Sequence, residues 1–536
     1  QPDSFTVTLS PGGSDVASNA AALKVRTELT SENTGAPVST EEFRLLSGTP
    51  LHAVADTAGL PDGGYIFRIG ISKSAGNTLL NTGHYFVCVG QEYPELKSDL
   101  VSLGHSIEQH SYRSESLKFA RSSFMFLEYL VKEAAKVLEE GTIADTFSTS
   151  AYRRNLDLAQ ESVREAKTLA EVFANDTDPL ASKLALGTAS NADPLAGQTG
   201  VIQRAYLSTF HRELRPYTVF VPSTYDPARP TPLIALMLTP GPTPDWRSSP
   251  AERGSVHSES LALAEKKGYL IVWPTGRRLE AEVNFFDVLR EMKQDYNIDE
   301  DRIYMMGVSG GGLASWLIGL RFPEQIAAIC PISALTVVSE STERPEKTST
   351  ALLRERSAYH FPMNALHVPV IMLHGDADTT SLCELQARPM ARRMNELGLE
   401  LEYVEYPGVG HGLGDSYADG FARALAFFDR HRNVRHPRTI DYSTPGMRYN
   451  KAYWIRIGGF QKKGRFARVE ASAEGNTVEI RTENVAGFSI LRDEVVFDVA
   501  KPLTVFIDRA MVYKGPLPTS GGVGFSRASG GDWHLQ

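Results

Sequence analysis

Cysteine is scarce in this chain of 536 residues, and its three cysteines, Cys88, Cys330 and Cys383, lie far apart. Their spacing predicts neither a disulfide framework nor a cysteine metal site. Apolar runs are short, and none approaches the roughly 20 residues that a membrane-spanning helix needs. Basic tracts are missing, and the formal net charge of −9 argues against a protein that wraps a nucleic acid backbone. We therefore expect no metal, no membrane partner and no nucleic acid partner.

The composition is that of a globular protein, with 42% hydrophobic and 22% charged residues, and the length predicts two to four domains. Residues 1–98 contain short β-branched or aromatic segments between turn-forming residues, namely FTVTLS, EEFRLLSG, GYIFRIGIS and HYFVCVG. These segments predict a β-sandwich-like domain. The chain starts at Gln1, and QPDSFTVTLSPGG resembles the mature end of an exported protein, so we expect a periplasmic or secreted bacterial location.

The pattern changes in residues 99–200. Apolar residues recur in steps of three and four from Leu117 to Leu138, and again from Tyr152 to Phe173. This periodicity predicts two amphipathic helices packed as a hairpin. The residues that follow, up to 200, are rich in Ala, Asp, Gly, Pro and Ser, which is typical of a linker.

Residues 201–435 alternate between near-continuous apolar segments, such as TPLIALMLTPG, YLIVWPTG and VPVIMLHG, and amphipathic ones. The alternation predicts an α/β domain with a doubly wound, mostly parallel sheet covered by helices on both faces. Ligands of such sheets bind beyond the carboxyl ends of the strands, so polar residues placed directly after strands are the functional candidates. Residues 436–536 return to short alternating strands, with EGN as a hairpin turn, and predict a second β-sandwich-like domain.

One glycine-rich stretch, GVSGG at residues 307–311, lies between the strand-like RIYMM and the helix-like GGLASWLIGL. It fits the pattern G-x-S-x-G in the strand–turn–helix context of a nucleophile elbow, which lifts the hydroxyl of Ser309 clear of the sheet. We expect Gly307 and Gly311 to permit the sharp turn. The pattern alone also allows a simple tight turn. A phosphate-binding loop is a poorer fit, because the lysine of a Walker motif is missing.

A serine nucleophile needs a base, and the base needs an orienting acid. Asp378 follows the strand VPVIMLHG, and His411 follows the next strand in a glycine-rich loop, YPGVGHG. Each residue alone is compatible with a plain turn or surface position. The chain order Ser309, Asp378, His411, with each residue after its own strand, is the order of α/β-hydrolases. We therefore predict a catalytic triad of these three residues.

These motifs resemble the α/β-hydrolase superfamily, in particular the secreted esterase group that includes feruloyl esterases, acetyl xylan esterases, polyhydroxybutyrate depolymerases and predicted peptidases. The likeness covers about residues 205–432. RPYTVFVPSTYDP resembles the entry segment of that group, and DYNIDEDRIYMMGVSGGG resembles its strand and elbow, including Asp299 and Arg302. HGDAD resembles its acid loop, in which the last aspartate is the triad acid, so the resemblance implies Asp378 rather than Asp376. GVGHG resembles its histidine loop.

One segment departs from that group. Where the group has His-Gly after an early strand, this chain has Leu238-Thr239-Pro240-Gly241. The loop normally supplies a backbone N–H to the oxyanion hole, and Pro240 has none to give. We expect Thr239 or Gly241 to donate instead, together with the N–H of Gly310. Two tryptophans that follow strands, Trp246 and Trp273, are candidates for lining the substrate pocket.

The predicted reaction is the hydrolysis of a carboxylic ester through an acyl-enzyme, with no metal or organic cofactor. The partner is a small-molecule or polysaccharide-linked ester, and the sequence does not indicate an oligomeric state. Two alternatives stay open. A peptidase of the same fold uses the same residues, although no repeat of 40–50 residues predicts the propeller usual in prolyl peptidases. A catalytically weak protein that binds carbohydrate or protein on a hydrolase core would fit the altered oxyanion loop.

Overall fold

A computed structural model divides the chain into two compact units, Gln1–Leu186 and Gly187–Gln536. No helix among the described residues is long and apolar enough to cross a membrane. The structure describes residues 4–9, 23–31, 36–45, 51–56, 60, 63–73, 79–89, 98–105, 125–132, 134–135, 159–160, 162–164, 166–167, 197–237, 258–274, 279–338, 350–528 and 531–536.

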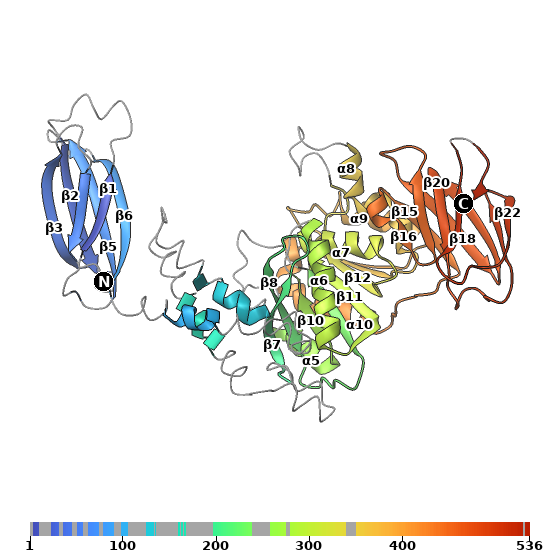
Figure 1. Cartoon of the computed structure of the whole chain (residues 1–536), viewed down its shortest axis with the longest axis horizontal. Coiled ribbons are helices and arrows are strands. Elements are labelled where there is room, and N and C mark those ends of the chain that lie inside the picture. The colour runs from blue at the N-terminus through green and yellow to red at the C-terminus, as the bar shows by residue number, and fades with distance from the viewer. Residues whose placement is uncertain are drawn as a thin grey trace. The chain divides into compact units, whose positions relative to one another are not determined.

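The strands of the first unit form two antiparallel sheets (Figure 1). β1 (Ser4–Leu9) pairs with β4 (Leu51–Asp56). The other sheet has the order β3-β2-β5-β6, with strands β3 (Pro37–Leu45), β2 (Leu23–Ser31), β5 (Gly63–Lys73) and β6 (Leu79–Val89). Val25, Thr27 and Leu29 alternate on the buried face of β2. Strands β2 and β4 were not predicted from the sequence.

Helical turns at residues 98–105, 125–132, 134–135, 159–160, 162–164 and 166–167 belong to the same unit. Buried positions include Leu127, Val131 and Ala134, and in the later turns Ala159, Val163 and Ala166. These are positions on the predicted apolar stripes. The remaining positions of the two predicted stripes lie outside the described residues: Leu117, Ala120, Phe124, Leu138, Tyr152, Leu156, Ala170 and Phe173.

The second unit is built on an eight-stranded sheet of order β14-β13-β12-β11-β9-β10-β8-β7. Six strands are parallel, and β8 is antiparallel to both of its neighbours. Its strands are β7 (Gly200–Leu207), β8 (Leu214–Val221), β9 (Thr231–Met237), β10 (Leu270–Trp273), β11 (Ile298–Val308), β12 (Ala328–Ile332), β13 (Val370–Gly375) and β14 (Leu401–Tyr406). The doubly wound, mostly parallel sheet is as predicted, although the sequence analysis did not identify β7 and β12.

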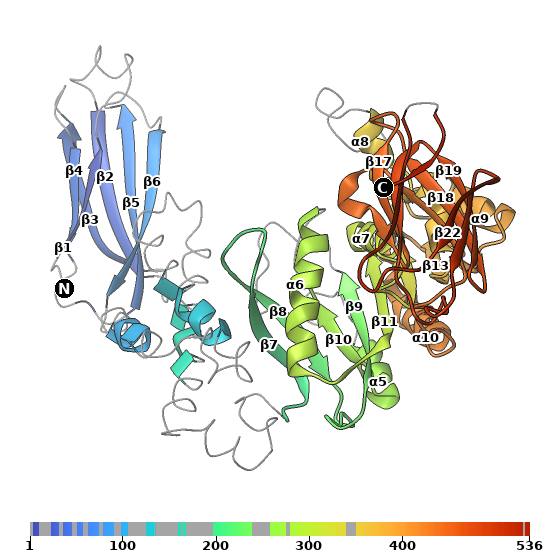
Figure 2. The ribbon, with the colours of Figure 1, turned by 45° about the vertical axis from the view of Figure 1, so that its right-hand side comes forward.

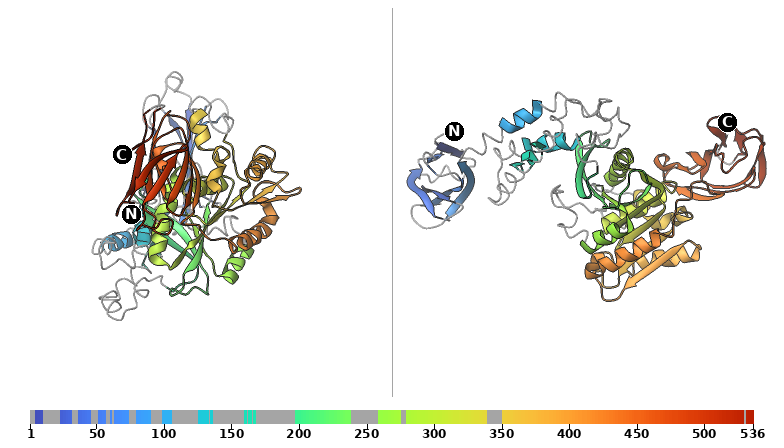
Figure 3. Two further views of the ribbon diagram at one scale, coloured as in Figure 1. Left: turned by 90° about the vertical axis from the view of Figure 1, so that its right-hand side faces the viewer. Right: turned by 90° about the horizontal axis from the view of Figure 1, so that it is seen from below.

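Helices cover both faces of this sheet (Figures 2 and 3). Apolar side chains of α6 (Leu279–Asp295), α7 (Gly310–Arg321) and α9 (Ala387–Glu396) share one buried cluster with one face of the sheet. Those of α5 (Ser258–Lys267) and α10 (Tyr417–Phe428) share another cluster with the opposite face. Burial on both faces explains why the central strands are almost wholly apolar.

The C-terminal strands form two five-stranded sheets whose inner side chains make one core. The first has the order β15-β18-β19-β21-β22 and contains β15 (Thr439–Thr444), β18 (Ala467–Glu474), β19 (Thr477–Glu483), β21 (Leu503–Ile507) and β22 (Ala510–Gly515). The second has the order β16-β17-β20-β23-β24 and contains β16 (Lys451–Ala452), β17 (Ile455–Phe460), β20 (Val485–Leu491), β23 (Gly522–Ser526) and β24 (His534–Leu535). The EGN segment is the expected turn, with Glu474 paired to Thr477.

Polar contacts join the C-terminal sheets to the α/β part of the same unit. The side chain of Asn364 donates to the carbonyl of Ser443 at 2.9 Å and accepts from its N–H at 2.8 Å. Arg321, the last residue of α7, is buried, pairs with Glu282 at 3.2 Å and donates to the Tyr449 hydroxyl at 3.1 Å. A buried charge that lacks a partner is costly, so these contacts fix how the two parts meet.

Candidate active site

Ser309 lies between β11 and α7. Its φ of 58° and ψ of −117° form a backbone conformation that residues other than glycine rarely adopt. Such a conformation costs about 1–3 kcal/mol and persists only where the surroundings enforce it. Two backbone hydrogen bonds do so here. The N–H of Ser309 donates to the carbonyl of Ile332 at 2.8 Å, and its own carbonyl accepts from Leu313 at 2.9 Å. The serine is therefore held at the carboxyl edge of the sheet, on the first turn of α7.

Glycines are required around Ser309 because backbone segments approach closely there. A Cβ on Gly307 would lie 2.6 Å from the carbonyl carbon of Gly311 and 2.6 Å from the carbonyl oxygen of Met237. A Cβ on Gly312 would lie 2.8 Å from the Gly307 oxygen and 2.7 Å from the Cβ of Ala334. The sequence analysis named Gly307 and Gly311. Gly312 was not predicted, because the reason for a glycine at this position is the close approach of Ala334, which follows β12.

The acid loop, residues 375–381, follows β13 and carries Asp378. The Asp378 side chain is fully buried, and its Oδ2 accepts a hydrogen bond from His411 Nδ1 at 2.8 Å. Its Oδ1 accepts from the N–H groups of Thr380 and Ser381, each at 2.8 Å. Burial alone would raise the pKa of Asp378, but the bonds from Ser381, His411 and Thr380 lower it below its ordinary value. The carboxylate is thus kept ionised.

Asp376, two residues earlier, is exposed and has a different partner. Its Oδ1 accepts from the N–H of Gly408, which ties the acid loop to the loop after β14. The structure therefore places Asp378, and not Asp376, against His411.

The histidine loop, residues 408–414, follows β14 and carries His411, which is half-buried. Gly412, Leu413 and Gly414 all have positive φ, at 76°, 69° and 47°. The Cβ position of Gly412 lies 3.3 Å from a methyl group of Val308, the residue before Ser309. The loop is thus packed against the elbow at Val308. Because Nδ1 of His411 is bonded to Asp378, Nε2 is the ring nitrogen that remains for proton exchange.

Two buried polar residues that the sequence analysis did not single out support these loops. His374, the penultimate residue of β13, is 1% exposed; its Nε2 donates to the carbonyl of Ser381 at 2.6 Å and lies 3.4 Å from Asp378 Oδ2. Burial lowers the pKa of His374, which keeps the ring neutral. Ser333, just after β12, has φ 45° and accepts a hydrogen bond from Gly412 N–H at 3.1 Å. A polar residue at the very end of an apolar strand is the sequence signal that could have identified both.

The structure describes only some of the other predicted site residues. Gly310, the first residue of α7, is exposed, so its backbone lies at the surface beside Ser309. Thr239, Gly241 and Trp246 lie outside the described residues. Trp273 is 1% exposed and packs in the core beneath α5 and α10, so the expectation that it lines an open pocket is wrong. Its position at the end of an apolar strand, buried on both faces, is the physical reason.

No group of three or more His, Cys, Asp or Glu side chains suited to a metal ion occurs in the described part of the chain. Cys330 lies in the sheet core, and burial raises the pKa of its thiol. Cys383 is also buried, and its Sγ lies 3.2 Å from the Tyr403 hydroxyl. Neither thiol is poised as a nucleophile.

One family model matches within the α/β part of the chain. The model of the prolyl oligopeptidase family matches residues 282–435, less than a third of the chain, and this segment contains Ser309, Asp378 and His411. Acyl-protein thioesterase 1 of Gibberella zeae is 28% identical over 127 residues, which cover 24% of this chain and 48% of the relative. A bifunctional acetylxylan esterase/xylanase of Neocallimastix patriciarum is 28% identical over 137 residues, covering 24% of this chain and 19% of the relative. The chain thus spans about half or less of these curated relatives.

Solved structures are also similar to part of this chain. A ferulic acid esterase is 20% identical with a TM-score of 0.37, and the alignment covers 44% of this chain and 98% of that protein. The acylaminoacyl peptidase of Pyrococcus horikoshii is 15% identical with a TM-score of 0.36, covering 44% of this chain and 42% of that protein. The α/β part of the chain has the α/β-hydrolase fold, and the chain is similar in sequence to the prolyl oligopeptidase family and to relatives that are named as esterases.

Proposed function

We propose that this protein hydrolyses carboxylic esters through a covalent acyl-enzyme, with Ser309 as nucleophile, His411 as general base and acid, and Asp378 as the orienting acid. The observation that carries the proposal is the 2.8 Å hydrogen bond between His411 Nδ1 and the buried Asp378 carboxylate, at the edge where Ser309 is held at φ 58°. An aspartate in this position fixes the imidazole tautomer and stabilises the imidazolium that forms during catalysis.

The acylation step begins when His411 Nε2 takes the proton from Ser309 Oγ. The oxygen then attacks the carbonyl carbon of the ester and forms a tetrahedral intermediate. His411 returns the proton to the departing alcohol oxygen as the C–O bond breaks, which leaves an acyl-serine. In the second half a water gives a proton to Nε2 and attacks the acyl carbon, and Ser309 is released with its proton restored.

The negative charge on the carbonyl oxygen needs backbone donors. Gly310, directly after the nucleophile and at the amino end of α7, is the first proposed donor, and the end of a helix favours negative charge there. Thr239 or Gly241 is proposed as the second. These residues, with the triad, account for each proton transfer and bond change, so the proposal requires no metal or organic cofactor.

Esters are the proposed substrates, either small or linked to a polysaccharide. Two of the curated relatives are named as a thioesterase and an acetylxylan esterase/xylanase, which supports ester chemistry. The match to the prolyl oligopeptidase family favours a second candidate, a serine peptidase that uses the same residues. Steady-state rates on p-nitrophenyl acetate and on a matched p-nitroanilide would separate the two, since a peptidase would cleave the anilide at a comparable rate.

The experiment that tests the proposal is the Ser309→Ala variant assayed with p-nitrophenyl acetate and a fluorophosphonate probe. We expect hydrolysis to fall by several orders of magnitude and labelling to be lost, because the attacking oxygen is absent. Ser472→Ala, at an exposed position on β18, is the control and should keep both signals. Retained labelling of the Ser309 variant would reject the assignment. A wild-type protein that is folded but never labelled would favour the alternative of a binding protein with an inactive hydrolase core.

A further inference from the structure

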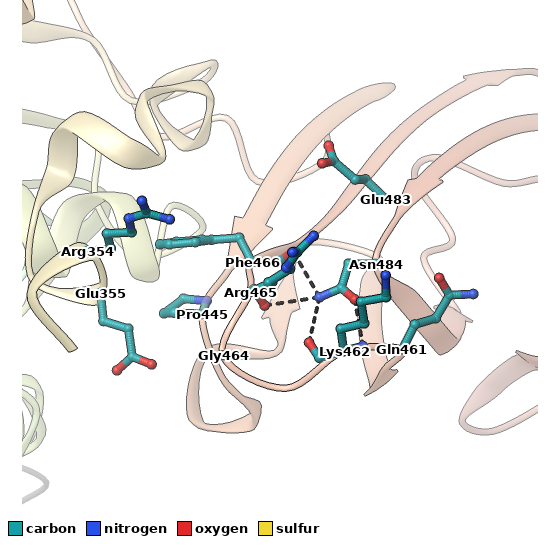
Figure 4. A pocket seen from close by; sticks show the side chains of 10 residues that line it. All are labelled: Arg354, Glu355, Pro445, Gln461, Lys462, Gly464, Arg465, Phe466, Glu483 and Asn484. Carbon is teal, nitrogen blue, oxygen red and sulfur yellow. Dashed lines mark hydrogen bonds between the residues drawn. The ribbon is translucent and has the colours of Figure 1, made fainter. Parts of the chain in front are cut away.

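A cavity of about 480 Å³ lies between α8 (Thr350–Glu355) and the loops at one end of the C-terminal sheets (Figure 4). It is remote from the candidate active site. The carbonyl of Glu355, a lining residue, accepts a hydrogen bond from Arg321 at 2.8 Å. Arg321 ends α7, whose 12 residues begin next to Ser309 and span about 18 Å. The cavity is therefore a separate place on the molecule.

The wall formed by residues 461–466 is a built structure. Asn484 has a left-handed φ of 57°, and its Nδ2 donates to the carbonyls of Lys462, Arg465 and Phe466 at 3.0–3.2 Å. Its Oδ1 accepts from the N–H of Lys462 at 2.7 Å. One side chain thus satisfies four backbone groups of the loop, which fixes the loop before any ligand arrives.

The aromatic ring of Phe466, the last residue of this wall, lines the cavity. Phe466 is half-buried, and its ring is stacked on that of Phe361, with centroids 5.7 Å apart and planes 29° apart. Phe361 itself is 2% exposed and belongs to the core of the α/β part. Because the ring of Phe466 lines the cavity and is stacked on that of the buried Phe361, it gives the cavity an apolar surface whose orientation is fixed.

Three cationic side chains surround this surface. Arg354, Lys462 and Arg465 are exposed and line the cavity, and within the described part of the chain their side chains form no ion pair or hydrogen bond. The acids of the lining, Glu355 and Glu483, do not pair with them, and the Glu355 carboxylate points away from the Phe466 ring in Figure 4. In a chain of net charge −9, three exposed cations that line one hollow and have no partner among the described residues favour an anionic ligand.

We propose that this cavity is a binding site for a carboxylate carried on a ring with a flat apolar face. The ring packs on Phe466, and the carboxylate accepts charge-assisted hydrogen bonds from Arg465 and Lys462. The volume is in the range of sites for small ligands, which often lie between domains. A uronic acid residue of an oligosaccharide and an aromatic acid share this chemistry. The inference does not depend on catalysis by Ser309.

The test is isothermal titration calorimetry on the full chain carrying Ser309→Ala, so that no ligand is turned over. Ligands are compared in pairs that differ in the carboxylate: a glucuronic-acid-substituted xylotriose against plain xylotriose, and cinnamate against cinnamyl alcohol. The decisive variant is the double change Lys462→Ala and Arg465→Ala, both at exposed positions that can be altered without disturbing the core. Arg481→Ala is the matched control, because Arg481 is 74% exposed on β19 and does not line the cavity.

We expect one acidic ligand to bind at least tenfold more tightly than its neutral partner, and the double variant to lose at least tenfold in affinity. Arg481→Ala should bind as tightly as its parent. Which acid binds identifies the source of the ligand. Equal binding by acidic and neutral partners, no binding by either acid, or full affinity in the double variant would overturn the proposal. Phe466→Leu, which keeps an apolar side chain, should weaken binding of the acidic ligand, with thermal melting as the check on folding.

Discussion

The acid loop and the histidine loop follow neighbouring parallel strands but are held in different ways. In the acid loop, Asp378 is bonded by the N–H groups of Thr380 and Ser381, and His374 bonds to the Ser381 carbonyl. All of these partners lie within eight residues of each other. In the histidine loop, Gly412 donates to Ser333, 79 residues away, and packs against Val308. Backbone groups of its own loop therefore hold the Asp378 carboxylate, whereas the loop of His411 is held by residues that are distant in the sequence.

The proposed mechanism gives this difference a functional reason. The acid must stay ionised and immobile, and backbone N–H groups around a buried carboxylate achieve both. His411 must present Nε2 to Ser309, which follows another strand. Contacts with residues outside the histidine loop therefore have to position that loop against the elbow. Besides the bond between His411 and Asp378, three hydrogen bonds join the acid loop to β14 and the histidine loop: from Ala377 N–H to Val409, from Asp376 N–H to Tyr406 and from Gly408 N–H to Asp376. A substitution that displaces one loop is therefore expected to displace the other loop as well.

The largest expected effect is at the acid itself. Asp378→Asn should lower kcat for p-nitrophenyl acetate on the order of 10⁴-fold, because the amide no longer stabilises the imidazolium and favours the wrong tautomer. Asp376→Asn, two residues away and facing Gly408, is the control and should stay within a few-fold of wild type. Steady-state kinetics measure both. Equal losses in the two variants would show that the loop as a whole, and not the Asp378–His411 bond, carries the effect.

The junction between the loops should be the next most sensitive place. A Cβ on Gly375 would lie 2.1 Å from the carbonyl oxygen of Val409 and 2.7 Å from that of Gly410. Gly375→Ala must push the loops apart, and we expect a loss of about 3 kcal/mol or more in unfolding free energy. Gly410→Ala is the control, since its Cβ position has open space and its φ is −85°. Urea denaturation measures both, and a stable Gly375 variant would contradict the close contact.

His374 should show its role in the pH dependence of stability. Its pKa is lowered by burial, opposed by Ser381 and Asp378, with His411 and Glu405 also nearby. The unfolded chain therefore takes up this proton at higher pH than the folded chain does. The stabilisation is full above about pH 6.5 and is lost as the pH falls below that value.

The test compares His374→Gln, which keeps an N–H donor for Ser381, with His374→Leu, which does not. Below pH 6.5 the unfolding free energy of wild type should fall more steeply than that of the Gln variant. At pH 7.5 the Gln variant should keep most of kcat, and the Leu variant should lose about tenfold, because the Ser381 carbonyl is left unpaired. Identical pH slopes in wild type and the Gln variant would show that His374 does not titrate in this way.

The smallest effect is expected in the histidine loop. Ser333→Ala removes one hydrogen bond to Gly412 N–H, which is worth about 1 kcal/mol. We expect kcat to fall about three- to tenfold with KM little changed, because the base is less well placed while binding is not altered. Ser520→Ala, at an exposed position, serves as the control. A change confined to KM would place Ser333 in substrate binding instead.

Sequence patterns anticipated the parts whose signal is local. Apolar strands between amphipathic helices predicted the central sheet, and glycines around Ser309 predicted a tight strand–helix turn. Strand β12 was missed, because AICPI is short and contains proline. That omission also hid Ser333, since a residue at a strand end is recognised only once the strand is. His374 was passed over because Asp378, four residues later, has the clearer resemblance to a triad acid.

The sequence by itself determined the order Ser309, Asp378, His411 and the placement of each after its own strand. The tertiary structure decided which carboxylate faces the imidazole, because parallel strands β13 and β14 bring Asp378 to His411 and turn Asp376 towards Gly408. It also decided that the Trp273 side chain is buried, because helices cover both faces of the sheet. The cavity beside Phe466 has no counterpart in any motif, because its walls come from segments about 110 residues apart that only folding brings together.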